Sequence, residues 1–148
     1  TEVLRSYREA SRETYHANRD VVDGWQWSAT LDARTCPVCI SMHGERFDTE
    51  DSLDSHPSCR CSLVPSTKPW EELGFPDMQE TQVSLEPGSE WFSRQEPALQ
   101  RTVLGPAKFA AYSDGRLQLG DLVKKTRSRR WGAGRAERSL RDVLGASA

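Results

Sequence analysis

Four cysteines and one histidine have the residue types and spacing that suit metal chemistry. Cys36 and Cys39 form a Cys-x2-Cys pair, and after sixteen further residues His56, Cys59 and Cys61 follow in the run HPSCRC. These two clusters hold all four cysteines of the chain. Structural Zn²⁺ takes four nitrogen or sulfur ligands in a tetrahedron. The sequence therefore predicts a zinc site, with five candidate ligands for four positions.

The order of preference among the ligands places Cys36 and Cys39 first and Cys59 next. His56 and Cys61 are equal candidates for the last position. On a strand Cys59 and Cys61 would face the same side, so either or both could reach the metal. The four cysteines could instead form two disulfides in an oxidising compartment. Short-spaced cysteine pairs with a nearby histidine favour metal. Thiolate ligands and a neutral histidine also imply that metal binding weakens at low pH.

A catalytic zinc is the alternative to a structural one. It would keep an open position beside an acid, and Glu45, Asp48 and Asp54 are near in sequence, with His43 as a candidate base. The chain contains no Ser–His–Asp set, phosphate-binding loop or HExxH run. We therefore expect no catalytic residue, and a structural hydrogen bond for His43 at the end of its helix.

Short elements must position these ligands. Residues 25–31 read as a strand, Pro37 opens a short helix that Gly44 ends, and residues 45–47 and 60–64 read as two further strands. Asp32 is expected to accept backbone N–H groups of the cysteine turn, and Arg34 to pair with an acidic side chain. A three-stranded unit of about forty residues has too little core to fold firmly alone. The metal would therefore substitute for the missing core.

Helices are expected on both sides of this sheet. Residues 2–19 read as a helix with Val3, Tyr7, Ala10 and Thr14 on its packing face. Residues 65–88 read as a linker with a short helix near Trp70, and helices follow at 90–95, 98–104, 106–113 and 135–144. The predicted fold class is α+β: an N-terminal helix, a small antiparallel zinc-stapled sheet and a C-terminal cluster of short helices. The expected divisions are a helix that continues from an upstream region (1–22), a zinc-knuckle β unit (23–65), a linker (66–88) and a helical C-terminal lobe (89–148).

The composition bounds these expectations. The chain has 148 residues, of which 36% are apolar, so we expect a modest core. It begins at Thr1 rather than Met, and we therefore expect a segment upstream. No apolar run approaches the ~20 residues of a membrane span, so no membrane partner is expected.

The charge is unevenly distributed behind a formal net charge of −2. An acidic segment, residues 71–96, contains seven acids and one base. A basic tract, residues 124–141, contains eight bases and one acid. The basic tract reads as a mobile loop that could contact packaged DNA, lie solvated, or meet the acidic segment. The DNA contacts would come from Lys124, Lys125, Arg127, Arg129 and Arg130.

The region from Trp27 to Pro65 resembles the phage Mu F-like minor head proteins, also called the phage head morphogenesis family. The pattern is an aromatic strand, Asp-x-Arg-Thr, Cys-Pro-x-Cys, His-Gly and a closing His-Pro-x-Cys-Arg-Cys. The tail is similar to family members at residues 91–95, 104–106 and 121–123. The residues that carry the central motif are Trp27, Asp32, Arg34, Thr35, Cys36, Pro37, Cys39, His43, Gly44, His56, Pro57, Cys59, Arg60 and Cys61.

The resemblance implies a non-enzymatic minor capsid protein that acts in head assembly near the portal. Its partners would be the portal protein, the major capsid protein or both. Its place would be the virion, in the capsid interior or at the portal vertex, after assembly in the host cytoplasm. A zinc-dependent nuclease or host-directed toxin, and a nucleic-acid-binding zinc module, are the alternative functions that the ligand cluster leaves open.

Overall fold

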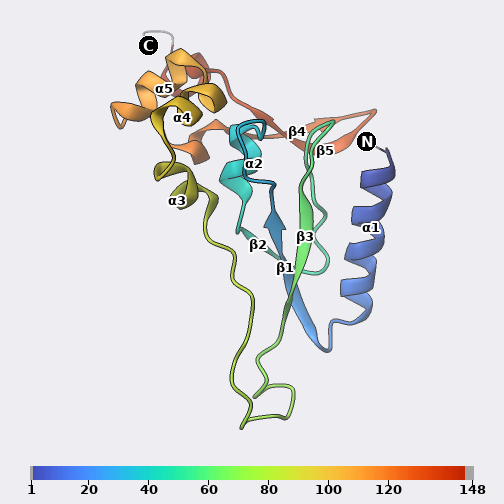
Figure 1. The fold of residues 1–148 in the computed structure, drawn as a ribbon. Coiled ribbons are helices and arrows are strands. Elements are labelled where there is room, and N and C mark those ends of the chain that lie inside the picture. Colours follow the sequence, from blue (N-terminus) through green and yellow to red (C-terminus); the bar gives the residue numbers. More distant parts are fainter. Residues whose placement is uncertain (1, 146–148) are drawn as a thin grey trace.

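A small sheet, flanked by one long helix and a lobe of short helices, forms the protein in the computed structural model, which describes residues 2–145 (Figure 1). None of the described helices has the length and apolarity of a membrane span. In chain order the elements are α1 Glu2–Ala17, β1 Val22–Ser28, α2 Pro37–Met42, β2 Arg46–Phe47, β3 Ser62–Thr67, α3 Gly88–Ser93, α4 Pro97–Leu104, α5 Pro106–Ser113, η1 Leu119–Leu122, β4 Val123–Ser128, β5 Gly132–Glu137 and α6 Leu140–Leu144.

The predicted antiparallel sheet is confirmed, with the strand order β2-β1-β3. Trp25 pairs with Phe47 of β2 on one side, and Trp27 pairs with Leu63 of β3 on the other. The strand β3 does not end at Pro65, as expected, but continues to Thr67. Proline is tolerated there because β3 is an edge strand, where a missing N–H need not break the ladder.

Two apolar clusters make up the core. The sheet cluster contains Trp25, Trp27, Ala29, Leu63 and three of the cysteines. The lobe cluster is built from α2, the short helices and η1, and contains Ile40, Phe92, Leu104, Ala111, Leu117, Leu119 and Leu122. Helix α2 contributes Cys39 to the first cluster and Ile40 to the second, so it joins the two.

The predicted helix at the N-terminus is confirmed, but its predicted packing face is wrong. Val3 and Tyr7 are 81% and 66% exposed, and Ala10 and Thr14 are exposed as well. The buried residue of α1 is Arg8, which donates hydrogen bonds to two backbone carbonyls of the cysteine loop. The helix is held by these polar bonds at its first half and by Tyr15, which packs against the sheet cluster, near its end.

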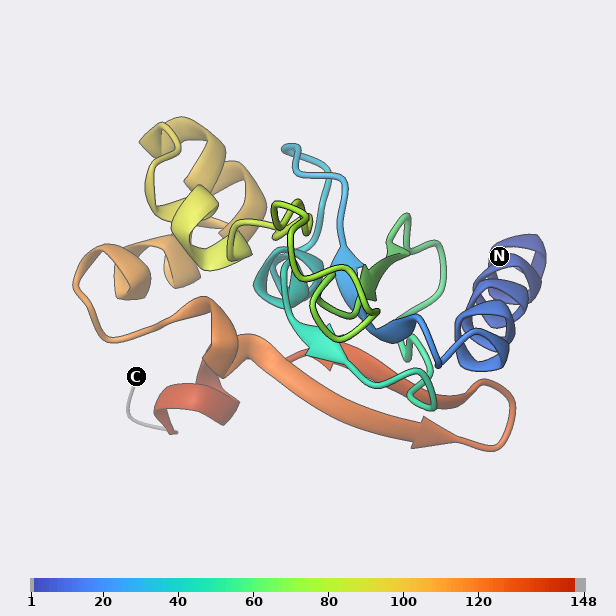
Figure 2. The same cartoon turned by 90° about the horizontal axis from the view of Figure 1, so that it is seen from below.

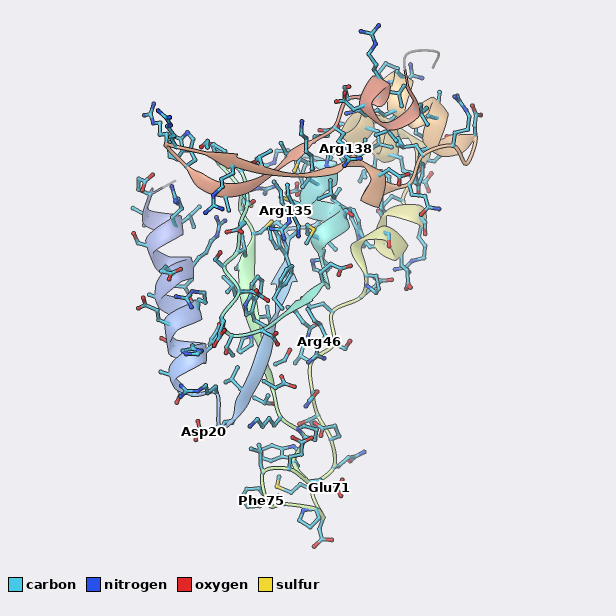
Figure 3. All side chains as sticks on the ribbon, turned by 180° about the vertical axis from the view of Figure 1, so that it is seen from behind. Asp20, Arg46, Glu71, Phe75, Arg135 and Arg138 are labelled. Carbon is cyan, nitrogen blue, oxygen red and sulfur yellow. The ribbon has the colours of Figure 1, made fainter. Side chains whose placement is uncertain are left out.

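The segment between β3 and α3 projects from the body as a long loop, with Glu71 and Phe75 near its tip (Figure 3). The helix expected near Trp70 is absent from this described segment, and turns occupy residues 70–74. The returning part of the loop is held to β1, because the Gln26 side chain donates to the Val83 carbonyl at 2.7 Å and accepts from Leu85 N at 2.9 Å.

The basic tract forms a β-hairpin, β4–β5, instead of the expected mobile loop. The helix expected at 135–144 is accordingly shorter, because residues 132–137 belong to β5 and α6 begins after Ser139. Gly132 has a φ of 70°, which suits glycine where the chain reverses. Figure 2 shows the hairpin running from the helical lobe towards α1. The acidic loop around Glu71 lies at the other end of the molecule from Arg135 and Arg138 (Figure 3).

Candidate metal centre

The fold brings the two predicted ligand clusters together. Cys36 and Cys39 lie at the start of α2, and the loop before β3 brings the second cluster to them. His56 Nε2 lies 3.2 Å from both Cys36 Sγ and Cys39 Sγ, and Cys39 Sγ lies 3.6 Å from Cys59 Sγ. All four cysteines are free thiols, whereas a disulfide requires sulfurs about 2.05 Å apart.

Three distances between donor atoms, of 3.2, 3.2 and 3.6 Å, are close to the edges of a metal tetrahedron. With zinc–sulfur bonds of about 2.3 Å and zinc–nitrogen bonds of about 2.0 Å, two sulfurs lie about 3.8 Å apart and a sulfur and a nitrogen about 3.5 Å apart. Two groups of donors each lie within 4.8 Å of one another: Cys36, Cys39 and His56, and Cys39, Cys59 and Cys61. Cys39 belongs to both groups and is the centre of the site. The cluster could therefore hold a metal ion.

The orientation of His56 suits metal binding. Its Nδ1 lies 2.8 Å from the carbonyl oxygen of Pro57, and a carbonyl can only accept, so Nδ1 carries the proton. The other nitrogen, Nε2, is then free to act as a ligand, and it faces the sulfurs of Cys36 and Cys39. A backbone carbonyl that fixes the tautomer in this way is a common partner of a metal-binding histidine.

Local backbone geometry aims the sulfurs. Pro37 is the first residue of α2, and the Cys36 side chain accepts a hydrogen bond from Cys39 N at 3.4 Å as the cap of that helix. In the second cluster Cys59 Sγ accepts from Cys61 N at 3.3 Å. Ser58 adopts a left-handed conformation with a φ of 62°, which lets the His-Pro-Ser-Cys segment turn back. Backbone N–H groups thus stabilise negative charge on two of the sulfurs.

The hydrogen bonds of the donors shift their pKa values. The hydrogen bond with Cys39, and then that with His56, lowers the pKa of Cys36 to about 4. The hydrogen bond with Cys36 raises the pKa of His56 to about 9. In the absence of metal these two residues thus favour a thiolate and an imidazolium. A metal ion would replace the imidazolium proton, so that metal binding and proton release are linked.

Arg60, not Arg34, is the main partner of Asp32. The Arg60 guanidinium bonds both carboxylate oxygens of Asp32 at 2.9 and 2.7 Å, and lowers its pKa well below the usual range. Asp32 also accepts from Arg34 N at 2.8 Å, as expected for the cysteine turn. The side chain of Arg34 lies 3.9 Å from the same carboxylate. The Asp32–Arg60 pair thus fastens the two ligand loops to each other beside the cluster.

Two buried arginines beside the cluster were not anticipated from the sequence. Arg8 is 8% exposed and donates to the carbonyls of Cys59 and Cys61, both at 2.8 Å. Arg135 is also 8% exposed; it donates to the Asp54 carbonyl at 2.6 Å and lies over the Trp27 ring, 5.0 Å from its centroid. Burial lowers the pKa of Arg135. Burial distinguishes these two arginines from surface bases. No helical or strand periodicity in the sequence indicates that burial.

Neither buried guanidinium has a carboxylate partner. Within residues 2–145 the ion pairs closer than 4 Å involve other bases. A buried charge is costly unless an opposite charge or strong hydrogen bonds compensate it. The cysteine cluster is one source of negative charge near Arg135, beside the more distant carboxylates of Asp54 and Asp51. The surroundings of the cluster thus favour an anionic form of it.

The candidate catalytic groups do not gather at the cluster. The ring of His43 is buried, and its Nδ1 accepts a hydrogen bond from Ala29 N at 3.0 Å. This is the structural bond that was expected for His43 at the end of its helix, and burial lowers its pKa. Among the described residues no carboxylate joins either group of donors. Glu45 and Asp48 are exposed, and Asp54 accepts from the hydroxyl of Ser52.

One comparison with known proteins gives a match. The sequence model of a family described as "Phage Mu protein F like protein" matches residues 1–64. The matched region includes α1, Arg8, β1, α2 and all five candidate ligands. No curated protein and no solved structure matches the chain.

Proposed function

We propose that the protein is a minor capsid component that acts in head assembly near the portal, because the model of the phage Mu F-like family matches residues 1–64. Its partners are then the portal protein, the major capsid protein or both, and its place is the capsid interior or the portal vertex. Support comes from the position of the ligand cluster, which lies entirely within the matched residues and ties together the elements of the sheet unit.

The cluster is proposed to bind one structural Zn²⁺ through Cys36, Cys39, His56 and Cys59. Contacts of 3.2 Å join His56 to Cys36 and Cys39, and Cys59 joins this group through its 3.6 Å contact with Cys39, so that closing a tetrahedron would draw Cys59 inward. Cys61 belongs to the second group of donors but lies near the indole of Trp27, whose buried N–H has no hydrogen-bond partner among residues 2–145. Cys61 is therefore assigned to the lining of the site, where its sulfur can accept from Trp27.

The observation that carries the zinc proposal is the pairing of this donor set with two buried arginines. Three thiolates, one neutral histidine and Zn²⁺ have a net charge of −1, which Arg8 and Arg135 can compensate without a carboxylate. Four protein ligands leave no open coordination position, which is the arrangement of a structural zinc. The ion would cross-link the start of α2 to the loop before β3. It would thereby stabilise the conformation of the sheet unit that the portal or capsid protein binds.

Cobalt substitution tests the metal and the choice of ligands. The purified protein is expected to contain about one equivalent of zinc. Replacing zinc with Co²⁺ should give the absorption bands of a tetrahedral site with three thiolates. Cys59→Ser should lose a sulfur-to-cobalt band, whereas Cys61→Ser, the matched control two residues away, should keep the spectrum. Less than about half an equivalent of zinc, with disulfides found by mass spectrometry, would remove the metal from this proposal.

Electron microscopy of complete particles tests the head role. Particles that contain the protein with a small electron-dense tag are expected to show the label on the inner surface, at the portal vertex. An untagged particle and a particle with the tag on the major capsid protein serve as controls. Label spread over the whole shell would contradict the portal placement, and particles without the protein would contradict the capsid role itself.

A further inference from the structure

The two strands of the hairpin have different surroundings. Beside β5 lies the loop that carries Asp54 and Ser55. Arg135 N donates to the Ser55 carbonyl, and the Arg135 side chain donates to the Asp54 carbonyl. A Cβ atom at Gly134 would lie 2.7 Å from the Ser55 oxygen, so glycine permits this close approach. The loop before β3 therefore covers part of β5, and β4 is the more exposed strand of the hairpin.

The exposed bases lie on β4 and on the turn that follows it. These five side chains are Lys124, Lys125, Arg127, Arg129 and Arg130, all in exposed residues. The covered strand β5 consists mostly of glycine and alanine, and its one base, Arg135, is buried. The one acid between residues 123 and 137 is Glu137, which forms an ion pair with Lys108. The outer face of the hairpin is thus a concentrated positive surface.

Trp131 extends this positive surface to α1. The indole is 38% exposed at the end of the hairpin turn. The guanidinium of Arg130 lies 5.0 Å from its ring centroid, and that of Arg5 lies 5.9 Å away. Arg5 also donates to the Trp131 carbonyl at 3.4 Å, while its ion pair with Glu2 is long, at 3.9 Å. Two guanidinium groups from distant parts of the sequence are thus held at one aromatic ring, a geometry that cation–π attraction stabilises.

We propose that β4, the β4–β5 turn and Arg5 form a binding surface for the phosphate backbone of duplex DNA. Arginine and lysine are the usual phosphate contacts in DNA-binding proteins, and a two-stranded ribbon has the width that the major groove admits. Since the surface consists of charge, it binds without regard to base sequence. The proposal rests on the head role only for the identification of the DNA as packaged DNA.

The same bases could instead protect the exposed edge of β4 from pairing with strands of other chains. Charged side chains, lysine above all, keep a free sheet edge from pairing with other chains. Edge protection explains Lys124 and Lys125 on β4, but it does not require Arg129 and Arg130 in the turn, nor the placement of Arg5 at the same ring. These additional cations favour a ligand with several phosphates.

Binding of the full-length protein to a fluorescent duplex of random sequence tests the surface. With about six phosphate contacts, the logarithm of affinity should fall against the logarithm of salt with a slope of about −5, or about 10³-fold between 50 and 200 mM salt. Replacing Arg127, Arg129 and Arg130 with Gln should reduce the slope by about 3 and weaken binding to all duplexes alike. Unchanged affinity in this triple variant would overturn the proposal.

A charge-matched control separates the surface from net charge. Replacing the exposed residues Arg19, Arg101 and Arg116 with Gln removes the same charge elsewhere and should leave the slope unchanged. Single-stranded DNA that competes per phosphate supports the same phosphate chemistry, whereas equal competition by poly-glutamate contradicts it. The DNA-binding assay uses purified protein and no particle. A negative result would therefore not contradict the portal placement. Conversely, absence of the protein from particles would not contradict a measured affinity for DNA.

Discussion

The sheet cluster and the lobe cluster are two cores of similar size with different chemistry. The sheet cluster contains three buried cysteines among two tryptophans and small apolar residues. The lobe cluster contains leucine, isoleucine, phenylalanine and alanine, with no cysteine or histidine. Aliphatic burial stabilises a core by about 25 cal/mol per Å² without any ligand, whereas buried thiolates require a counter-charge. If the proposed zinc is bound, the sheet should depend on it and the lobe should not.

Metal removal should separate the two clusters most strongly. A structural zinc contributes about 10–16 kcal/mol to the folding of zinc-finger peptides at pH 7, more than the sheet can replace from its own core. With a chelator, the backbone amides of Trp25 and Trp27 should lose most of their protection from hydrogen exchange. The amides of α4 and α5 should keep theirs. Equal loss in both regions would mean that the two cores unfold as one unit.

Phe92→Ala should test the comparison from the other side. Phe92 is fully buried, and its ring meets that of Tyr112 edge to face at 5.4 Å. Truncating a buried phenylalanine costs about 3–5 kcal/mol, so the thermal stability of the lobe should fall. The Co²⁺ spectrum of the metal centre should remain unchanged. Phe75→Ala is the control, since Phe75 lies exposed in the projecting loop and its loss should change stability by less than about 0.5 kcal/mol.

The sequence predicts the sheet unit well because its signals are local. Pro37 and Gly44 bound α2, alternating residues mark β1, and ligand spacing brings the two cysteine clusters together. Each of these signals acts within a few residues, and the metal-ligand pattern supplies the long-range pairing. The five candidate ligands could therefore be named from the sequence, but the choice of four among them stays a proposal.

The remaining features depend on contacts between distant segments. Arg8 looks like a surface base until the carbonyls of Cys59 and Cys61 are placed beside it. The hairpin has few strand-forming residues in β5, and its contact with the sheet unit is made through the loop carbonyl of Ser55. Neither partner lies within fifty residues of the segment that it orders, so no helical or strand period could reveal the contact.

Gly88→Ala should weaken the packing of α3 against α2, the helix that joins the two clusters. A Cβ atom at Gly88 would lie 1.8 Å from the Ile40 carbonyl oxygen, and this contact is with backbone, so α3 would have to move away from α2. Overpacking of this kind costs typically 1–3 kcal/mol, and we expect the free energy of unfolding to fall by about 3 kcal/mol. The unfolding temperature of the lobe should fall in calorimetry. Gly120→Ala, where no atom lies within 4 Å of the added carbon, should unfold as before.

Arg8→Met should reveal how much the buried arginine contributes to the sheet alone. Methionine keeps the length and apolar stem of the side chain but leaves the carbonyls of Cys59 and Cys61 without their donor. A buried acceptor without a partner costs about 1–3 kcal/mol, so the sheet should lose about 2 kcal/mol by chemical denaturation. Metal should also dissociate faster, because the positive charge beside the thiolates is gone. Arg12→Met on the same helix removes only a surface ion pair with Glu9 and should cost less than about 1 kcal/mol. If both variants lose the same stability, Arg8 acts through the helix rather than through the metal loop.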